Sequence, residues 1–368
     1  MPINLKPVVL MLLLVWLNGW QSVKAAVIED LYEARIAVDN QSKQAQVKAF
    51  SLAFKQVLLK VRGNSDLLND QKITSTLPKA TRFVRAYSYD RQGSQLYLVI
   101  SFDPNPVQNL IRSAGFPVWD KRRPDSILWL AIQTTDALSR QIVTASQYPE
   151  IYQQMRSSAA HRGLSLTLPL WDLGDVESLG VYDIWGEFNN QILQASERYA
   201  ASSVLSARIY QKNALITDVA TPENTATSQI WLADWLLMEG GDILTGQVQG
   251  DNPTLIAKAL VDGLADQLSS KYAIDLSKVD RANSKIQIVI NNMDSLNYYT
   301  QASSFLANMS IVNDATLVKQ QGPRATFELD LLGDVEDLNN AFRLDNKIRP
   351  VVDDFGQRIS DLEFFWVK

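Results

Sequence analysis

Three acidic residues and two tryptophans lie close together in the sequence and are its clearest candidates for chemistry. Asp172, Asp175 and Glu177 directly follow an apolar run. That run ends at Trp171, and Trp185 lies further along the chain. Two carboxyl groups facing each other across a cleft can hydrolyse a glycosidic bond, and tryptophan rings stack on sugars. The alternative is a polar loop beside core tryptophans, which is favoured because exposed acids in loops are common.

A basic cluster is the second candidate. Lys121, Arg122 and Arg123 follow one another directly, and Trp119 lies just upstream. Prolines bound the stretch 117–124, which we interpret as a connector between folded units. Such a cluster can contact anionic lipid headgroups on a membrane surface or an acidic partner. The alternative is an exposed linker, and a cluster of only three charges favours that alternative.

The familiar catalytic and metal-binding motifs are missing from the sequence. It contains no cysteine and one histidine, His161, which excludes a zinc site built from nitrogen and sulfur ligands. No nucleophile-elbow motif (G-x-S-x-G) accompanies this histidine, so a solvent-facing or helix-capping role is the simpler interpretation. Glycine-rich phosphate loops are also absent. We therefore expect no metal and no cofactor, and the sequence leans toward a protein that is not an enzyme.

The first 25 residues predict a cleavable signal peptide. Lys6 precedes an uninterrupted apolar run of 10 residues, 8–17. A transmembrane helix needs about 20 apolar residues, whereas the apolar region of a signal peptide has about 7–15. Cleavage after Ala25 or Ala26 fits the small residues there, and an uncleaved N-terminal anchor is the alternative. Without a cysteine for lipid attachment, the mature chain is expected in the periplasm of a Gram-negative bacterium.

The charge balance argues against a nucleic-acid partner. The chain has 35 basic and 40 acidic residues. Cleavage after Ala25 removes Lys6 and Lys24, which leaves 33 basic and 40 acidic residues and a net charge of −7 (33 − 40). A general nucleic-acid binder needs a strong basic excess. No segment after the signal peptide predicts a transmembrane helix.

Hydrophobic periodicity predicts a mixed α+β and α/β protein with three folded units. The expected units are a compact α+β domain at 27–116, a three-layer α/β domain at 125–275 and a ferredoxin-like βαββαβ module at 284–368. The pattern predicts strands at 31–38, 83–89, 95–102, 127–133, 166–171, 203–210, 229–238, 242–248, 284–290, 310–320, 325–331 and 362–367. It predicts helices from 42 to 62 and at 65–76, 104–114, 150–162, 182–200, 253–272, 296–308 and 335–342.

Several short motifs resemble a family of exported Gram-negative bacterial proteins known as domain of unknown function 2066. The motifs are LYEARIAV (31–38), LLKVRGN (58–64), AYSYD (86–90), VISFD (99–103), AGFPVW (114–119) and RPDSILWLA (123–131). The likeness is concentrated in these residues and continues more weakly toward the C-terminus. It implies export but no activity, substrate or catalytic residue.

Two functions of different classes follow. The first is a non-enzymatic envelope protein that acts in protein–protein interaction or assembly, with another envelope protein as its partner. The second is a protein that binds or hydrolyses a glycan such as peptidoglycan through the acidic and tryptophan residues. Hydrolysis requires two carboxyl groups across an open cleft, about 5–5.5 or 6.5–9.5 Å apart. The geometry of the acidic loop therefore separates the two.

Overall fold

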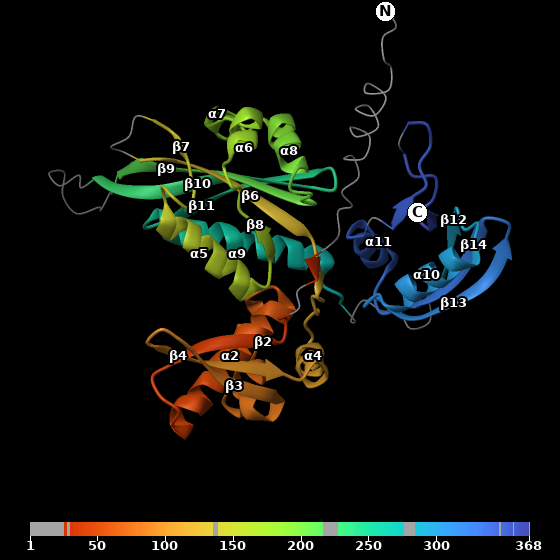
Figure 1. The fold of residues 1–368 in the computed structure, drawn as a ribbon, viewed down its shortest axis with the longest axis horizontal. Helices are drawn as coiled ribbons and strands as arrows, with labels where there is room; N and C mark the ends of the chain where they lie inside the picture. Colours follow the sequence, from red (N-terminus) through yellow and green to blue (C-terminus); the bar gives the residue numbers. More distant parts are fainter. Residues whose placement is uncertain are drawn as a thin grey trace, which may run out of the picture.

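The computed structural model describes residues 26–27, 30–134, 139–215, 227–275, 284–345, 347–355 and 357–367. The predicted signal peptide lies outside these residues. Three sheets of three or more strands are present in the described part, and a two-stranded ribbon joins β1 (Ala26–Val27) to β5 (Arg122–Arg123). Each larger sheet has its own hydrophobic core, and Figure 1 shows the corresponding units. The mixed α+β and α/β fold class is therefore confirmed.

The N-terminal unit is an antiparallel sheet covered on one face by a long helix. The sheet order is β2 (Glu33–Val38), β4 (Gln95–Phe102), β3 (Val84–Gln92). Alternate residues of β2 are buried against α2 (Lys43–Arg62), as the period-two pattern predicts. Ser42 caps α2 by accepting the Ala45 N–H. The remaining helices are α3 (Gln71–Thr76) and α4 (Pro104–Ser113), with 3₁₀ segments at Asp66–Asn69 and Leu77–Phe83.

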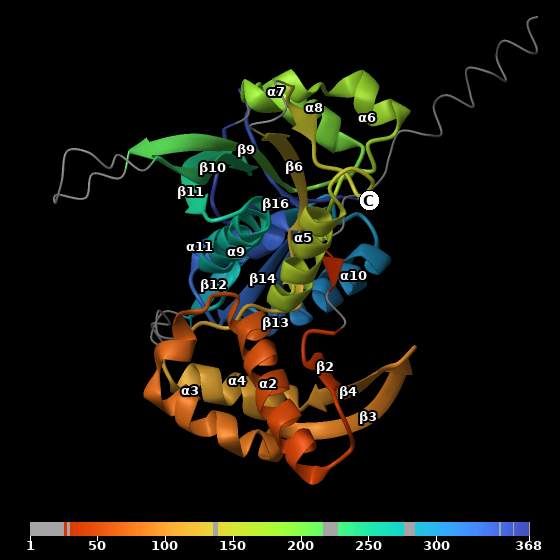
Figure 2. The same ribbon diagram turned by 90° about the vertical axis from the view of Figure 1, so that its left-hand side faces the viewer.

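The central unit has the predicted three layers. Its sheet has the order β11-β10-β9-β6-β7, with β8 also paired to β6. Helices α5 and α9 cover one face, and the short helices α6, α7 and α8 cover the other (Figures 1 and 2). The strands are β6 (Asp125–Gln133), β7 (Gln141–Ile142), β8 (Ser165–Thr167), β9 (Ser203–Leu215), β10 (Thr227–Glu239) and β11 (Asp242–Gly250). The helices are α5 (Pro149–Arg162), α6 (Leu173–Ser178), α7 (Val181–Trp185), α8 (Asn189–Glu197) and α9 (Pro253–Tyr272).

Strand β6 explains why this sheet is covered on both faces. Seven consecutive residues of β6 are buried, and its neighbour β9 runs parallel to it. Such a strand is apolar throughout because its two rows of side chains face two different cores. Trp129 belongs to the core under α8, where its indole N–H donates to Ser196 Oγ at 2.8 Å.

Two elements of the central unit differ from the prediction. The helix expected at 182–200 is broken into α7 and α8, with Glu187 between them in the left-handed region at φ 55°. The strand expected at 166–171 is reduced to β8, because the chain leaves the sheet and turns at Trp171, which also has φ 55°. Both changes create a cap of three short helices, which we call the cap (α6–α8).

The C-terminal unit contains the β-α-β-β-α order that the sequence predicts. Its sheet order is β13-β14-β12-β16-β15, and β14 lies antiparallel between β13 and β12 as in a split βαβ module. Its last strand, β16, runs parallel to β12, with β15 antiparallel at the edge. The elements are β12 (Lys285–Asn291), α10 (Leu296–Ala307), β13 (Val312–Gln321), β14 (Arg324–Leu331), α11 (Val335–Arg343), β15 (Ile348–Pro350) and β16 (Glu363–Trp366).

Among the residues described, no helix is both long and apolar enough to traverse a membrane.

Candidate functional site

The predicted acidic loop forms the start of α6, and an arginine holds its first carboxylate. Asp172 is the N-cap of α6 and accepts the Asp175 N–H at 3.1 Å. Arg198, directly after α8, donates from Nη1 to Asp172 Oδ1 at 2.7 Å and from Nη2 to Oδ2 at 2.9 Å. A two-point pair of this kind matches the planar guanidinium to the carboxylate. Asp172 therefore joins α6 to the end of α8.

Asp175 is the interior member of the same network. Its side chain is fully buried, and its Oδ2 accepts the Trp171 N–H at 2.8 Å and the Tyr199 hydroxyl at 2.6 Å. Its Oδ1 accepts from Arg198 Nη1 at 2.8 Å. These bonds explain how Trp171 is held in its left-handed conformation, because its N–H is fixed to the helix that follows. Both oxygens of this carboxylate are occupied within the protein.

The electrostatics of the network agree with this geometry. The hydrogen bond from Arg198 is the main cause that lowers the pKa of Asp172 to about 2. The pKa of the Arg198 guanidinium is raised, chiefly by the same bond to Asp172. Burial, followed by the bond to Asp175, raises the pKa of the Tyr199 hydroxyl to about 12. The Asp172 carboxylate stays ionised and the Tyr199 phenol stays neutral at neutral pH.

The remaining residues of the predicted site point to other roles. Glu177 is exposed on α6. Trp171 is half-buried and packs edge-on against the buried Trp129, with ring centroids 6.4 Å apart. Trp185 is also half-buried, and the Arg140 guanidinium lies 4.3 Å from its ring centroid. The structure thus brings Asp172 and Asp175 together as a structural ion-pair network, without the two unoccupied carboxyl groups that glycoside hydrolysis needs.

The cap carries a feature that the sequence did not lead us to expect, a set of six exposed apolar side chains on or beside α6–α8. Their exposed fractions range from 42 to 73%. Figure 2 shows α6, α7 and α8 at the end of the central unit that is remote from the N-terminal unit. Exposed apolar side chains gathered on one part of a structure are a common feature of interaction sites. We define the apolar face of the cap as Leu170, Leu173, Val176, Tyr182, Phe188 and Leu193.

A sequence signal for this face exists in retrospect. The inward residues Ile184 and Ile192 pack under the cap, so α7 and α8 each have a buried apolar side. On α6 the buried residue is Asp175, and Leu173 and Val176, three residues apart, are both exposed. An apolar residue on the polar side of a short helix is the pattern to look for.

The predicted basic cluster does not form one surface, because Arg123 is completely buried. Its guanidinium donates to three carbonyl oxygens of other segments: Lys60 at 2.5 Å, Gly163 at 2.8 Å and Arg162 at 3.0 Å. It also lies 3.9 Å from the ring centroid of the buried Trp119. Burial lowers the pKa of Arg123 to about 9, so it is still charged at neutral pH. This removes Arg123 from the predicted contact patch.

The two other members of the cluster have different surroundings. Lys121 is exposed. Arg122 is half-buried, donates to the Asn308 carbonyl at 3.3 Å and lies 5.8 Å from the Phe305 ring centroid. Those two residues belong to the C-terminal unit, so Arg122 joins the connector to that unit. Lys121 is thus the member that faces solvent.

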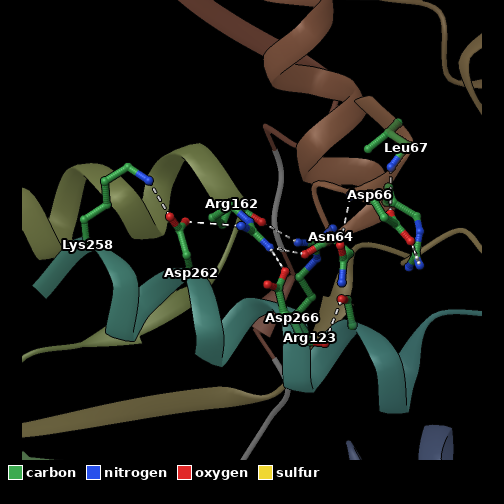
Figure 3. A network of polar contacts seen from close by, with 11 residues as sticks. Asn64, Asp66, Leu67, Arg123, Arg162, Lys258, Asp262 and Asp266 are labelled. Atoms are coloured by element: carbon green, nitrogen blue, oxygen red, sulfur yellow. Dashed lines mark hydrogen bonds and ion pairs between the residues drawn. The ribbon is translucent and has the colours of Figure 1, made fainter. Parts of the chain in front are cut away.

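Arg162 adds to the contact that Arg123 makes between the N-terminal and central units. We call this contact the junction and define it by Arg123, Arg162, Trp119 and Gly63. Arg162 on α5 donates to the Gly63 carbonyl at 2.5 Å and pairs with Asp262 at 3.2 Å and with Asp266 (Figure 3). Gly63 ends α2 at φ +78°, and an added Cβ would lie 2.3 Å from the Trp119 ring. Only glycine allows this close approach.

His161 is exposed on α5, and its Nδ1 lies 2.6 Å from the Ser157 carbonyl oxygen of the preceding turn. Within the described ranges, no group of three or more histidine, aspartate or glutamate side chains is placed to hold a metal ion.

Comparison with known protein families identifies both ends of the chain. Residues 284–359 match DUF2066. The chain carries a DUF2066 domain. Residues 25–120 match a second family, described as a domain of unknown function (DUF8605). The resemblance to DUF2066 is confirmed, but it lies in the C-terminal unit, whereas the motifs on which it was based lie mostly within the DUF8605 match. Neither a curated protein nor a solved structure matches the chain.

Proposed function

We propose that this DUF2066 protein is exported to the periplasm and acts there without catalysis, as an interaction or assembly factor that binds another envelope protein through the apolar face of the cap. The observation that carries the proposal is the cluster of exposed side chains on α6–α8, including Leu173 at 72% and Tyr182 at 67%. Protein interfaces concentrate apolar and aromatic side chains at their centres.

The polar network of the cap supports the same conclusion. Asp172, Asp175 and Arg198 bind one another and hold α6 to the end of α8. A network whose carboxylate oxygens accept hydrogen bonds from within the protein fixes the shape of a surface. It leaves few free carboxylate oxygens to activate a substrate. The cap is therefore a rigid platform for contact, and the glycan-hydrolysing alternative loses its catalytic pair.

The N-terminal sequence supports export to the periplasm. The apolar run at 8–17 and the small residues before Val27 support cleavage by a signal peptidase. The partner would then be a periplasmic protein or an outer-membrane protein with a periplasmic surface. Detection of a mature N-terminus at Ala26 or Val27 in a periplasmic extract tests this part separately.

The interaction is tested by crosslinking in intact envelopes followed by affinity capture. The wild type is compared with the double variant Leu173→Ser, Tyr182→Ser. Leu296→Ser is the matched control, because Leu296 is 82% exposed but lies on α10 of the C-terminal unit. We expect a reproducible partner with the wild type and the control, and its loss with the cap variant. The same partner recovered equally with all three proteins would contradict the proposal.

A further inference from the structure

The cap and the segment leading to it are strongly acidic. Between residues 163 and 197 the sequence contains no lysine or arginine. The same stretch contains six acidic residues: Asp172, Asp175, Glu177, Asp183, Glu187 and Glu197. The apolar face of the cap is thus carried by a stretch with only negative side-chain charges. This combination restricts the partner, because like charges repel across an interface.

The protein neutralises only part of this charge. Arg198 pairs with Asp172 and Asp175, and Arg208 Nη2 lies 3.5 Å from a carboxylate oxygen of Glu187. Glu177 and Glu197 are exposed, and among the described residues neither forms an ion pair. One of them lies on α6 and the other ends α8. They are the two acids with most capacity to attract a partner's cation.

The aromatic residues of the cap already hold one cation. The Arg140 guanidinium lies 4.3 Å from the Trp185 ring centroid and 5.7 Å from that of Tyr182. A positive group over an aromatic face is attracted by the ring quadrupole. Tyr182 is still largely exposed, as is Phe188. Their uncovered parts offer the same attraction to an arginine or lysine from another molecule.

From these observations we infer that the occupant of the cap is a basic, amphipathic segment of another protein. This inference rests on the proposed function and names the chemistry of its partner. Apolar side chains of the segment cover Leu173, Val176 and Phe188, and its lysine and arginine residues face Glu177 and Glu197. An anionic membrane surface carries the same sign of charge as the cap and is disfavoured. A second copy of the cap is disfavoured for the same reason.

The test uses the purified protein and a defined probe. The probe is a fluorescent helical peptide of leucine and lysine, about five turns long, and a second peptide has glutamate in place of every lysine. Binding is measured by anisotropy at low and high salt. The charge variant is Glu177→Lys, Glu197→Lys. Its control is Asp39→Lys, Asp354→Lys, which makes the same change at exposed residues outside the cap.

We expect the lysine peptide to bind the wild type and the control, with affinity that falls at high salt. The cap charge variant should bind it roughly tenfold more weakly, because two attractive contacts become repulsive. Leu173→Ser, Tyr182→Ser should also weaken binding. The glutamate peptide should not bind. Each result supports the inference.

Three outcomes would overturn it: no binding of the lysine peptide, equal loss in the cap charge variant and its control, or preferred binding of anionic phosphatidylglycerol vesicles. A different result would contradict the proposed function: capture of the same partner from envelopes by the wild type and by the Leu173→Ser, Tyr182→Ser variant. A cap that captures its partner but ignores the lysine peptide would therefore overturn only this inference.

Discussion

Two arginine networks in this protein use the same chemistry in different surroundings. At the junction, Arg123 is fully buried and donates to carbonyl oxygens of Lys60, Arg162 and Gly163. On the cap, the Arg198 side chain is 39% exposed and binds the carboxylates of Asp172 and Asp175. The first network joins segments from different units, and the second joins two helices of one unit.

Burial decides what each of these arginines contributes to the free energy of unfolding. A buried guanidinium is costly to desolvate. Removing either the guanidinium or its hydrogen-bond partners therefore lowers the free energy of unfolding strongly. An exposed guanidinium is screened by water and contributes little beyond local shape. The junction is therefore expected to govern the stability of the whole molecule, and the cap to govern recognition.

The largest effect is expected at the junction. Arg123→Met keeps much of the side-chain volume but leaves several carbonyl oxygens without a donor, which should cost about 3–5 kcal/mol of unfolding free energy. Lys121→Met removes the same charge two residues away from an exposed position and should change it by less than about 0.5 kcal/mol. Urea unfolding followed by tryptophan fluorescence measures both. Equal effects of the two substitutions would show that the junction does not govern the stability of the molecule.

An intermediate effect is expected at the interior of the cap network. Asp175→Asn keeps the shape of the buried side chain but turns one of its two accepting atoms into a donor. The loss should be about 1–3 kcal/mol. Glu177→Gln, an amide substitution at an exposed position of the same helix, serves as the control and should be near neutral. A cap that tolerates both equally would contradict the structural role given to Asp175.

The smallest effect concerns alkaline pH. The pKa of Tyr199 is raised to about 12 from an ordinary value near 10, so the folded protein favours the neutral phenol. The stabilisation is complete below pH 10 and is lost as pH rises from about 10 to about 12. The stability difference between the wild type and Tyr199→Phe should therefore shrink over that interval. A difference that is constant across the interval would disconnect Tyr199 from the Asp175 network.

Local patterns predicted much of the fold. Helix α9 begins at Pro253 and ends at Tyr272, as the proline and the apolar period indicate. The turn 239–242 also lies where expected, because its two glycines separate two β-rich runs. The break in the helix expected at 182–200 depends on the positive φ of Glu187, which no local preference favours.

The sites were harder to predict because they depend on long-range contacts. The acids were found, but their partner Arg198 lies 26 residues beyond Asp172, and sequence spacing does not show that the two meet. Consecutive charges at 121–123 indicate solvent, yet the β1–β5 ribbon and the packing of Trp119 enclose Arg123. The apolar face was missed because α6, α7 and α8 are each shorter than the window of about 11–18 residues over which an apolar period is recognised.

If the proposed function is right, the cap, and not the other exposed apolar residues, contacts a protein partner. A photo-crosslinking amino acid introduced at Phe188 on the cap tests it most directly, with the same amino acid at Phe355 as the comparison. Phe355 is 90% exposed on the C-terminal unit, so mere exposure would favour that position. We predict a discrete crosslinked protein from position 188 in intact envelopes and none from position 355. Crosslinking from 355 alone, or from neither position, would contradict the account.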